Sequence, residues 1–226
     1  MANTLKWLGQ SGWLLETGGG ATILIDAWLS KNPLAPMKIE ELPRADFFFL
    51  THDHSDHASD AVAITKHTGA TLVAQPETVK RYSQDGAPKV IGMNIGGTVD
   101  AKGVKATMVD AYHSSETGTP AGYIFTLEDG KVLYHAGDTA INANMALWGE
   151  LFAMDVALLP IGGHYTMDGA QAARALRMLR PKMALPMHYR TFPALAQTAD
   201  DFVNGAREHA PRTTIKVIEP GEAITF

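Results

Sequence analysis

Cysteine is absent from the 226-residue chain, and this absence removes disulfide bonds, thiolate metal sites and thiol nucleophiles from consideration. Any bound metal ion must therefore be held by His, Asp or Glu. The sequence also lacks a run of about 18 apolar residues, and residues 1–6 show no basic segment followed by a long apolar stretch, as an export signal would. We therefore expect no membrane association and a cytoplasmic location.

A strong charge imbalance and low-complexity tracts are also missing. The net charge of −5 gives no general attraction to nucleic acid or acidic lipid, so we expect no nucleic-acid partner. A small-molecule partner is expected from the site described below, and a homo-oligomer is left open. No Pro/Ser-rich or polar tract interrupts the hydrophobic residues, which excludes long disordered linkers. The glycine-rich segments 18–20 and 96–97 lack the GxGxxG pattern of nucleotide-binding loops. We predict a single domain over residues 1–226.

Short β-type runs dominate the first third of the chain and predict an antiparallel meander. A continuously apolar run, residues 46–50, follows them and ends abruptly in a polar cluster, as a strand buried on both faces would. After this run, helical and strand patterns alternate. The elements expected in this part are strands 4–8, 13–16, 21–26, 46–50 and 71–74, a helix over 59–67 and a helix opened by Pro76.

The second part of the chain returns to strands and repeats the alternation. A hairpin turn at 128–131 joins two strands of the segment 98–134. Asp168 can cap the start of a helix by accepting hydrogen bonds from backbone N–H groups. The other elements expected are strands 155–159, 183–187 and 214–218 and helices 141–152, 171–179 and 193–208. Because both halves run from strands into βαβα units, we predict an α/β fold, a four-layer αβ/βα sandwich of two mixed β-sheets flanked by helices.

Three of the nine histidines lie in the polar cluster that directly follows the apolar run 46–50. In an extended stretch alternate side chains share a direction, so His52 and His54 can reach one metal ion together. Asp56 and His57 come one turn later and can serve a second ion. The alternative is a solvated turn that caps the following helix, but it would leave several polar groups unsatisfied at the end of a buried strand.

Further candidate ligands follow other predicted strands. His113 comes after the run 104–112, Asp138 after 132–135 and His188 after 183–187. Each residue taken alone could equally be a hydrogen-bonded residue at the rim of the sheet. Taken together, the three positions favour metal ligands over rim residues.

The order and spacing of these ligands resemble the metallo-β-lactamase superfamily. The pattern is His52-x-His54-x-Asp56-His57, then His113, then Gly137-Asp138, then His188. The flanking motifs are similar to those of a family of bacterial and archaeal metal-dependent hydrolases, related to the ascorbate-6-phosphate lactonase branch. They are Trp7-Leu8-Gly9, the segments 111–115, 135–139 and 160–162, Tyr165-Thr166-Met167 and the segments 187–189 and 191–193. The match spans nearly the whole chain.

The resemblance implies a role for each ligand. It assigns His52, His54 and His113 to one metal ion, assigns Asp56, His57 and His188 to the other, and makes Asp138 the bridging carboxylate. Such ligands suit zinc first, with manganese, nickel or iron as alternatives. A hydroxide bridging the two ions would be the nucleophile, and Asp56 would orient it and carry a proton to the leaving group.

Five other residues deserve separate interpretation. Related members often have His where this chain has Gln10, which can form hydrogen bonds but cannot titrate. We predict a catalytic role for His164, in contact with the substrate or leaving group, with an exposed loop histidine as the alternative. His135 is interpreted as a core or supporting residue rather than a ligand. Asp26 orients a ligand or stabilises a turn, and Asp53 caps the next helix or bonds to a ligand histidine.

The sequence thus predicts a metal-dependent hydrolase with a binuclear site. Its expected substrate is a small ester-like compound, either a lactone or a phosphodiester. Two alternatives stay open: a non-catalytic metal-binding or sensing protein on the same fold, and a nuclease of the same superfamily. An amidohydrolase barrel is excluded, because eight βα units need about 250 residues and the Asp56-His57 doublet does not belong to that class.

Overall fold

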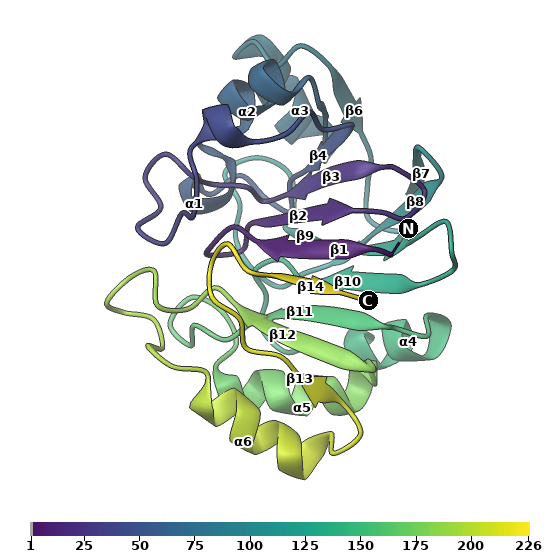
Figure 1. Ribbon diagram of the computed structural model, residues 1–226, viewed down its shortest axis with the longest axis vertical. Helices are drawn as coiled ribbons and strands as arrows, with labels where there is room; N and C mark the ends of the chain where they lie inside the picture. The colour runs from purple at the N-terminus through teal and green to yellow at the C-terminus, as the bar shows by residue number, and fades with distance from the viewer. Residues whose placement is uncertain (1) are drawn as a thin grey trace.

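A computed structural model describes residues 2–226, and it contains two seven-stranded sheets. Figure 1 shows the sheets in the middle of the molecule and helices at both ends. The first sheet has the order β14-β1-β2-β3-β4-β5-β6 and the second the order β13-β12-β11-β10-β9-β8-β7. The strands of the first sheet are β1 (Thr4–Trp7), β2 (Trp13–Glu16), β3 (Thr22–Ile25), β4 (Phe47–Phe49), β5 (Thr71–Ala74), β6 (Val90–Gly92) and β14 (Ala223–Thr225). Those of the second are β7 (Thr98–Ala101), β8 (Val104–Asp110), β9 (Ala121–Thr126), β10 (Val132–His135), β11 (Val156–Pro160), β12 (Met183–Met187) and β13 (Thr214–Ile215).

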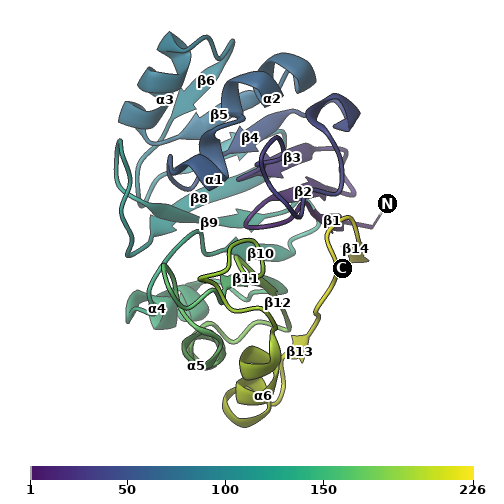
Figure 2. The same ribbon diagram turned by 90° about the vertical axis from the view of Figure 1, so that its left-hand side faces the viewer.

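Helices cover the outer face of each sheet, which confirms the four-layer α/β sandwich (Figures 1 and 2). On the first sheet these are α1 (Ser55–Ala58), α2 (Ala61–Thr68) and α3 (Pro76–Gln84). On the second they are α4 (Asn144–Leu151), α5 (Gly169–Leu179) and α6 (Asp200–His209). A short 3₁₀ helix, η1 (Ile39–Glu41), precedes β4. No helix within residues 2–226 has the length and apolar character needed to cross a membrane.

Strand β4 contributes side chains to the core on both faces of the first sheet. Alternate side chains of a strand point to opposite faces, so Phe48 packs in the cluster beneath α2 and α3, whereas Phe49 packs between the sheets. The Phe49 ring meets Tyr123 and Phe125 of the second sheet edge-on, at centroid distances of 5.1 and 5.0 Å. The strand is therefore buried on both faces, as its continuous apolar sequence predicts.

The antiparallel meander β1-β2-β3 is also confirmed, and the strand order then turns parallel through β4, β5 and β6. The second sheet repeats this plan, with antiparallel pairing from β7 to β10 and parallel pairing from β10 to β13. The exception to simple chain order is β14, which returns to pair antiparallel with β1. The segments that follow β4, β10 and β12 leave the sheets at carboxyl ends of strands, where α/β folds place their sites.

Several predicted boundaries are wrong, and the helix expected over 193–208 is the most informative case. Helix α6 begins only at Asp200, and residues 193–199 form a loop. The backbone N–H of Leu195 donates to the carbonyl of Phe192 at 3.0 Å, and that of Ala196 donates to the carbonyl of Gly162 at 3.0 Å. Because the Ala196 bond reaches a different loop, the backbone there is held in a non-helical conformation.

Other differences are smaller. Helical structure after β4 begins at Ser55 rather than at 59, and the helix expected over 141–152 shortens to Asn144–Leu151. The strand expected over 214–218 is reduced to Thr214–Ile215. Strands β6 and β14 were not predicted; both are three residues long and partly exposed at the edges of the first sheet, so neither has a clear apolar pattern.

Candidate metal centre

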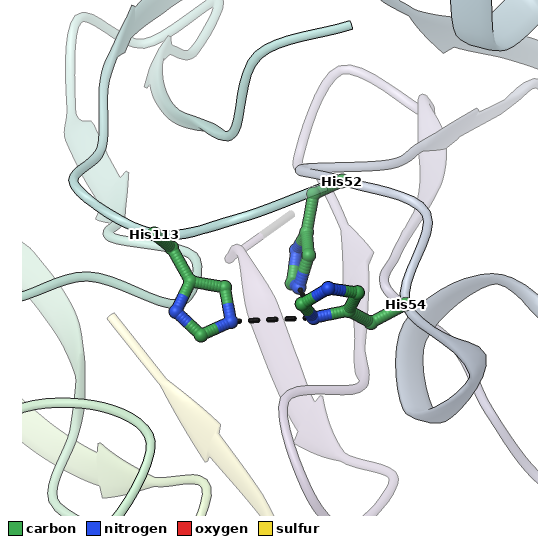
Figure 3. A group of neighbouring side chains, drawn as sticks. All are labelled: His52, His54 and His113. Carbon is green, nitrogen blue, oxygen red and sulfur yellow. Dashed lines mark hydrogen bonds between the residues drawn. The ribbon is translucent and has the colours of Figure 1, made fainter. Parts of the chain in front are cut away.

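Three histidines from two distant segments form the first ligand group. His52 and His54 lie in the extended stretch that joins β4 to α1, so their side chains share a direction, as predicted. His52 Nε2 and His54 Nδ1 are 3.1 Å apart. His113, which follows β8, places its Nε2 3.2 Å from the same His54 nitrogen. Figure 3 shows the three rings converging on one point from these two segments.

A second ligand group lies beside the first. It consists of Asp56 and His57 on α1, Asp138 after β10 and His188 after β12. Oδ2 of Asp56 lies 3.7 Å from His57 Nε2 and 3.5 Å from His188 Nε2. His188 adopts a left-handed backbone conformation with φ of 56°, and its N–H donates to the carbonyl of Gln10 at 3.1 Å. The chain therefore turns sharply at the strand end, which brings the imidazole into the centre.

The carboxylate of Asp138 touches both groups. Its Oδ2 lies 3.3 Å from His57 Nε2 and 2.9 Å from His188 Nε2. The same oxygen lies 4.0 Å from His52 Nε2 and 3.6 Å from His113 Nε2 in the first group. One buried oxygen thus faces four imidazole nitrogens, two from each group.

Buried polar atoms in the centre are left without hydrogen-bond partners among residues 2–226. They include Nε2 of His57, Nε2 of His188 and Oδ1 of Asp138. His188 Nε2 is close to Asp138 Oδ2 but lacks the geometry of a hydrogen bond. Unpaired buried polar atoms are costly and need an explanation. Imidazole nitrogens and carboxylate oxygens that converge within 4.8 Å of one another are suitable ligands for divalent cations, so the residues present fit the metal that this pattern implies.

Asp26 orients the ring of His57 through a hydrogen bond to Nδ1. Its buried carboxylate accepts a hydrogen bond from His57 Nδ1 at 2.8 Å and two from Thr51, through the backbone N–H at 2.8 Å and the hydroxyl at 2.7 Å. A carboxylate on the far ring nitrogen fixes the tautomer and leaves Nε2 free for a metal ion. Of the two roles considered for Asp26, the structure thus shows the contact with a candidate ligand.

The charges of the centre keep His52 neutral and Asp138 ionised, as metal binding requires, but they favour the protonated form of His188. Burial, together with the charge of His57, lowers the pKa of His52 to about 3, so this ring is neutral. Burial opposes ionisation of Asp138, but His188 and His57 outweigh it and hold the pKa of the carboxyl well below its usual range. Burial likewise disfavours the His188 imidazolium, but Asp138 raises its pKa to about 9. Protons and cations therefore compete for the same nitrogen atoms.

Gln10 was not recognised from the sequence as a neighbour of Asp56. Its side chain is buried, and Nε2 donates to Asp56 Oδ2 at 2.8 Å. The backbone carbonyl of Gln10 accepts hydrogen bonds from Trp7 Nε1 and from the N–H of His188. The sequence carries no signal for this contact because 46 positions separate the glutamine from the aspartate.

The two remaining histidine candidates lie outside the ligand groups. His135 is buried, its Nε2 donates to the carbonyl of Ser11 at 2.9 Å, and its Nδ1 accepts from the N–H of Gly137 at 3.1 Å. Both ring nitrogens are thereby used, which agrees with a core role. His164 is exposed, and its ring meets the edge of Tyr165 at a centroid distance of 4.5 Å. Its catalytic role stays a prediction.

Both roles predicted for Asp53 are wrong. The N-cap of α1 is the next residue, and no ligand histidine bonds to the Asp53 side chain among the hydrogen bonds of residues 2–226. The buried carboxylate instead accepts from the Ser115 hydroxyl at 2.7 Å and from the N–H groups of Glu116 at 2.7 Å and Thr117 at 3.1 Å. Its other oxygen accepts from the Thr117 hydroxyl and from Arg81. Asp53 therefore ties the loop after His113 to the segment that carries His52 and His54.

A cavity of about 710 Å³ opens over the two ligand groups. Candidate ligands and apolar side chains both line it. The lining residues are His54, Ser55, Asp56, His113, Ser114, Glu116, Asp138, Tyr165, His188, Phe192, Pro193 and Ala194. This volume is within the range of small-molecule sites, about 300–1,000 Å³.

Comparisons with known proteins agree with this geometry. Residues 21–189 match the model of the beta-lactamase superfamily domain. A UPF0173 metal-dependent hydrolase of Nitratidesulfovibrio vulgaris (strain DP4) is 45% identical, over 100% of this chain and 96% of that protein. Another, from Methanopyrus kandleri, is 42% identical over 97% of this chain and 98% of its own length.

Solved structures give the same assignment. The metallo hydrolase Igni18 of the archaeon Ignicoccus hospitalis superposes with a TM-score of 0.92 at 40% identity, covering 100% of this chain and 99% of its own. At 12% identity, the metallo-beta-lactamase fold protein YhfI of Bacillus subtilis shares the fold, with a TM-score of 0.77 over 100% of both chains. The chain therefore belongs to the beta-lactamase superfamily and, within it, to the UPF0173 metal-dependent hydrolases.

Proposed function

We propose that this metal-dependent hydrolase binds two divalent cations and cleaves a small ester-like substrate, either a lactone or a phosphodiester. The observation that carries the proposal is the position of Asp138 Oδ2, which lies within 4.0 Å of imidazoles from both ligand groups. His52, His54 and His113 would hold one cation, and Asp56, His57 and His188 the other, with Asp138 shared. Zinc suits this set first, and manganese, nickel and iron are alternatives.

When bound, a pair of divalent cations would lower the pKa of a water molecule and polarise the carbonyl or phosphoryl oxygen of the group that is attacked. Asp56 is placed to handle the proton. Its carboxylate lines the cavity and is 18% exposed, so it can accept a proton from the attacking water and pass it to the leaving group. Gln10 fixes the orientation of that carboxylate through its 2.8 Å hydrogen bond and, lacking a titratable proton, leaves the transfer to Asp56.

The cavity favours a small substrate over a nucleic acid. Proteins bind the phosphate backbone mainly through Lys and Arg, and neither residue type is among those lining the cavity. The same cavity favours an enzyme over a non-catalytic metal-binding protein. Asp56 and His113 are partly exposed to it, so the two groups are accessible to a substrate, as in sites that keep an open coordination position.

Metal content and hydrolysis, measured on the same preparations, test this proposal. Elemental analysis of the wild type should give about two ions per chain, with hydrolysis of a lactone or of bis(p-nitrophenyl) phosphate. The Asp138→Asn and His188→Ala variants should lose metal and activity together. His209→Ala, a histidine outside both groups, is the matched control and should retain both. Two ions retained in Asp138→Asn would contradict a shared carboxylate, and two ions without cleavage of any ester would contradict the substrate class.

His164 is tested separately from the ligands. If it contacts the substrate or leaving group, His164→Ala should lower turnover while metal content stays at the wild-type value. Unchanged kinetics would remove His164 from the mechanism. The next residue to test would then be the neighbouring Tyr165, which lines the cavity.

A further inference from the structure

We infer that the part of the substrate outside the reacting bond is uncharged and carries a flat apolar group that packs on Phe192. This inference rests on the proposed function, because it describes the substrate of the same site. It is carried by two independent features of the cavity. One is an apolar wall that is already fixed in place, and the other is the distribution of charge in the lining.

The apolar wall is built by the loop between β12 and α6. Phe192 is half-buried and lines the cavity. Its ring stacks on the buried Trp28, with a centroid distance of 6.0 Å and an interplanar angle of 25°. Stacking on a buried indole holds the phenyl ring in one orientation. Pro193 and Ala194 extend the apolar lining beside it.

Backbone hydrogen bonds hold this wall in shape. The Arg190 N–H donates to the carbonyl of Ala196 at 2.8 Å, and the Ala196 N–H donates to the carbonyl of Gly162 at 3.0 Å. The side chain of Gln197 donates to the carbonyls of Phe192 and Leu195 at 3.1 and 2.7 Å. Because the loop is tied at several points, little ordering is needed when a ligand packs against it, and preorganisation of this kind increases affinity.

An exposed aromatic ring lies at another part of the same cavity. Tyr165 comes from the loop between β11 and α5 and is 57% exposed, although it lines the cavity. The Gly163 N–H donates to the carbonyl of Met167 at 3.0 Å and closes the base of this loop. A ligand that covers Tyr165 and Phe192 removes apolar surface from water at both rings, which stabilises the bound state.

The charges of the lining select against an anionic substituent. Apart from the histidines, the charged residues lining the cavity are Asp56, Glu116 and Asp138, all of them acids. The nearby cation Arg81 is already paired, at 2.7 Å with Glu116 and at 3.0 Å with Asp53. A phosphate or carboxylate outside the reacting bond would therefore find no free basic side chain in the lining, because Arg81 already pairs with Glu116 and Asp53.

Matched lactones test the inference, with one ring carrying hydrogen, phenyl, carboxylate or phosphate at the same carbon. For the metal-loaded wild type we expect kcat/KM for the phenyl compound to exceed that for the unsubstituted ring by about tenfold, and that for either anion by about a hundredfold. Phe192→Ala should abolish the preference for phenyl over hydrogen through KM. Leu151→Ala, an exposed apolar residue on α4, is the control and should change nothing. Glu116→Gln should raise kcat/KM for the carboxylate compound several-fold.

Calorimetric binding of the same compounds separates failure of this inference from failure of the proposed function. Tighter binding of the phenyl compound, lost in Phe192→Ala, supports the inference even if no lactone is cleaved, in which case only the proposed reaction falls. Preferential binding or cleavage of the phosphate compound overturns the inference while the hydrolytic function stands. An unchanged preference in Phe192→Ala also overturns it.

Discussion

Replacing Asp53 by Ala removes a buried acceptor that connects two loops of the metal centre. The carboxylate has no exposed side-chain surface, and it accepts hydrogen bonds from the backbone N–H groups of Glu116 and Thr117 at 2.7 and 3.1 Å. It also accepts from the Ser115 hydroxyl at 2.7 Å and pairs with Arg81 at 3.0 Å. The Ala variant leaves the two backbone N–H groups without their acceptor, whereas the Ser115 hydroxyl and Arg81 keep the Thr117 carbonyl and Glu116 as acceptors.

The expected loss of stability follows from the two backbone donors. A fully buried donor left unsatisfied costs about 1–3 kcal/mol. Because both of these hydrogen bonds are part-buried, about 6 kcal/mol is the upper bound for the pair. We expect a decrease of about 3–4 kcal/mol in the free energy of unfolding for Asp53→Ala, after partial relaxation. Asp53→Asn retains an acceptor oxygen and should lose about 1–2 kcal/mol. The Arg81 pair adds little, because this arginine is 39% exposed.

Urea unfolding of the metal-free variants measures this loss without a contribution from bound ions. Asp85→Ala, at an exposed aspartate after α3, is the control and should stay within about 0.5 kcal/mol of the wild type. Elemental analysis should then show weaker binding at the group that contains His113, whose loop Asp53 holds. A free energy of unfolding for Asp53→Ala within about 0.5 kcal/mol of the wild type would refute the reasoning. So would an Asn variant as unstable as the Ala variant.

Three further predictions concern the supporting structure. His135→Ala breaks the bonds to Ser11 and Gly137 and should lower the free energy of unfolding by about 2–4 kcal/mol in urea titrations, yet leave metal content unchanged; loss of metal would make His135 a ligand. At Gly137, where φ is 64°, a Cβ would lie 2.5 Å from the Ala121 carbonyl oxygen. Gly137→Ala should therefore lower both the melting temperature and the metal affinity. A melting temperature and affinity equal to those of the wild type would contradict this close approach. Burial raises the pKa of Tyr82 to about 12, above the value of about 10 in the unfolded chain. The contribution of neutral Tyr82 to the free energy of unfolding is therefore complete below a pH of about 10 and should be lost as the pH rises from about 10 to 12. Absorbance titration at high pH checks this shift, and ionisation of every tyrosine in the range of the unfolded chain would disprove it; burial also raises the pKa values of Tyr123, Tyr134 and Tyr189.

The sequence was sufficient to predict those features of the structure that depend on residues close together along the chain. Alternation in an extended segment predicts that His52 and His54 lie together, and the apolar run around Phe48 predicts a doubly buried strand. The cap of α5 is confirmed as well, because the Asp168 carboxylate accepts from the N–H of Gln171 at 2.7 Å. Each of these features is settled within a few residues of the side chain concerned.

Sequence reasoning failed where distant segments decide the outcome. The contact between Gln10 and Asp56 spans 46 positions, and that between Asp53 and Thr117 spans 64. Neither residue type has a preference that reveals a partner so far away. The segment 193–199 contains residues compatible with a helix, but bonds to the loop at Gly162 override that propensity. The same override produces the apolar wall of the cavity, which could not be placed from the sequence.

The pairing of β14 with β1 means that one edge of the first sheet stays unpaired until residues 223–225 have been synthesised. In the second sheet the outer strand β7 directly precedes its partner β8, whereas the matching place in the first sheet is filled by residues 223–225. While the ribosome is still synthesising the chain, β1 is an open edge with free N–H and C=O groups, able to pair with another nascent chain. Truncations that remove residues 223–225 make this exposure permanent, so they should promote aggregation even though they leave every candidate metal ligand in place.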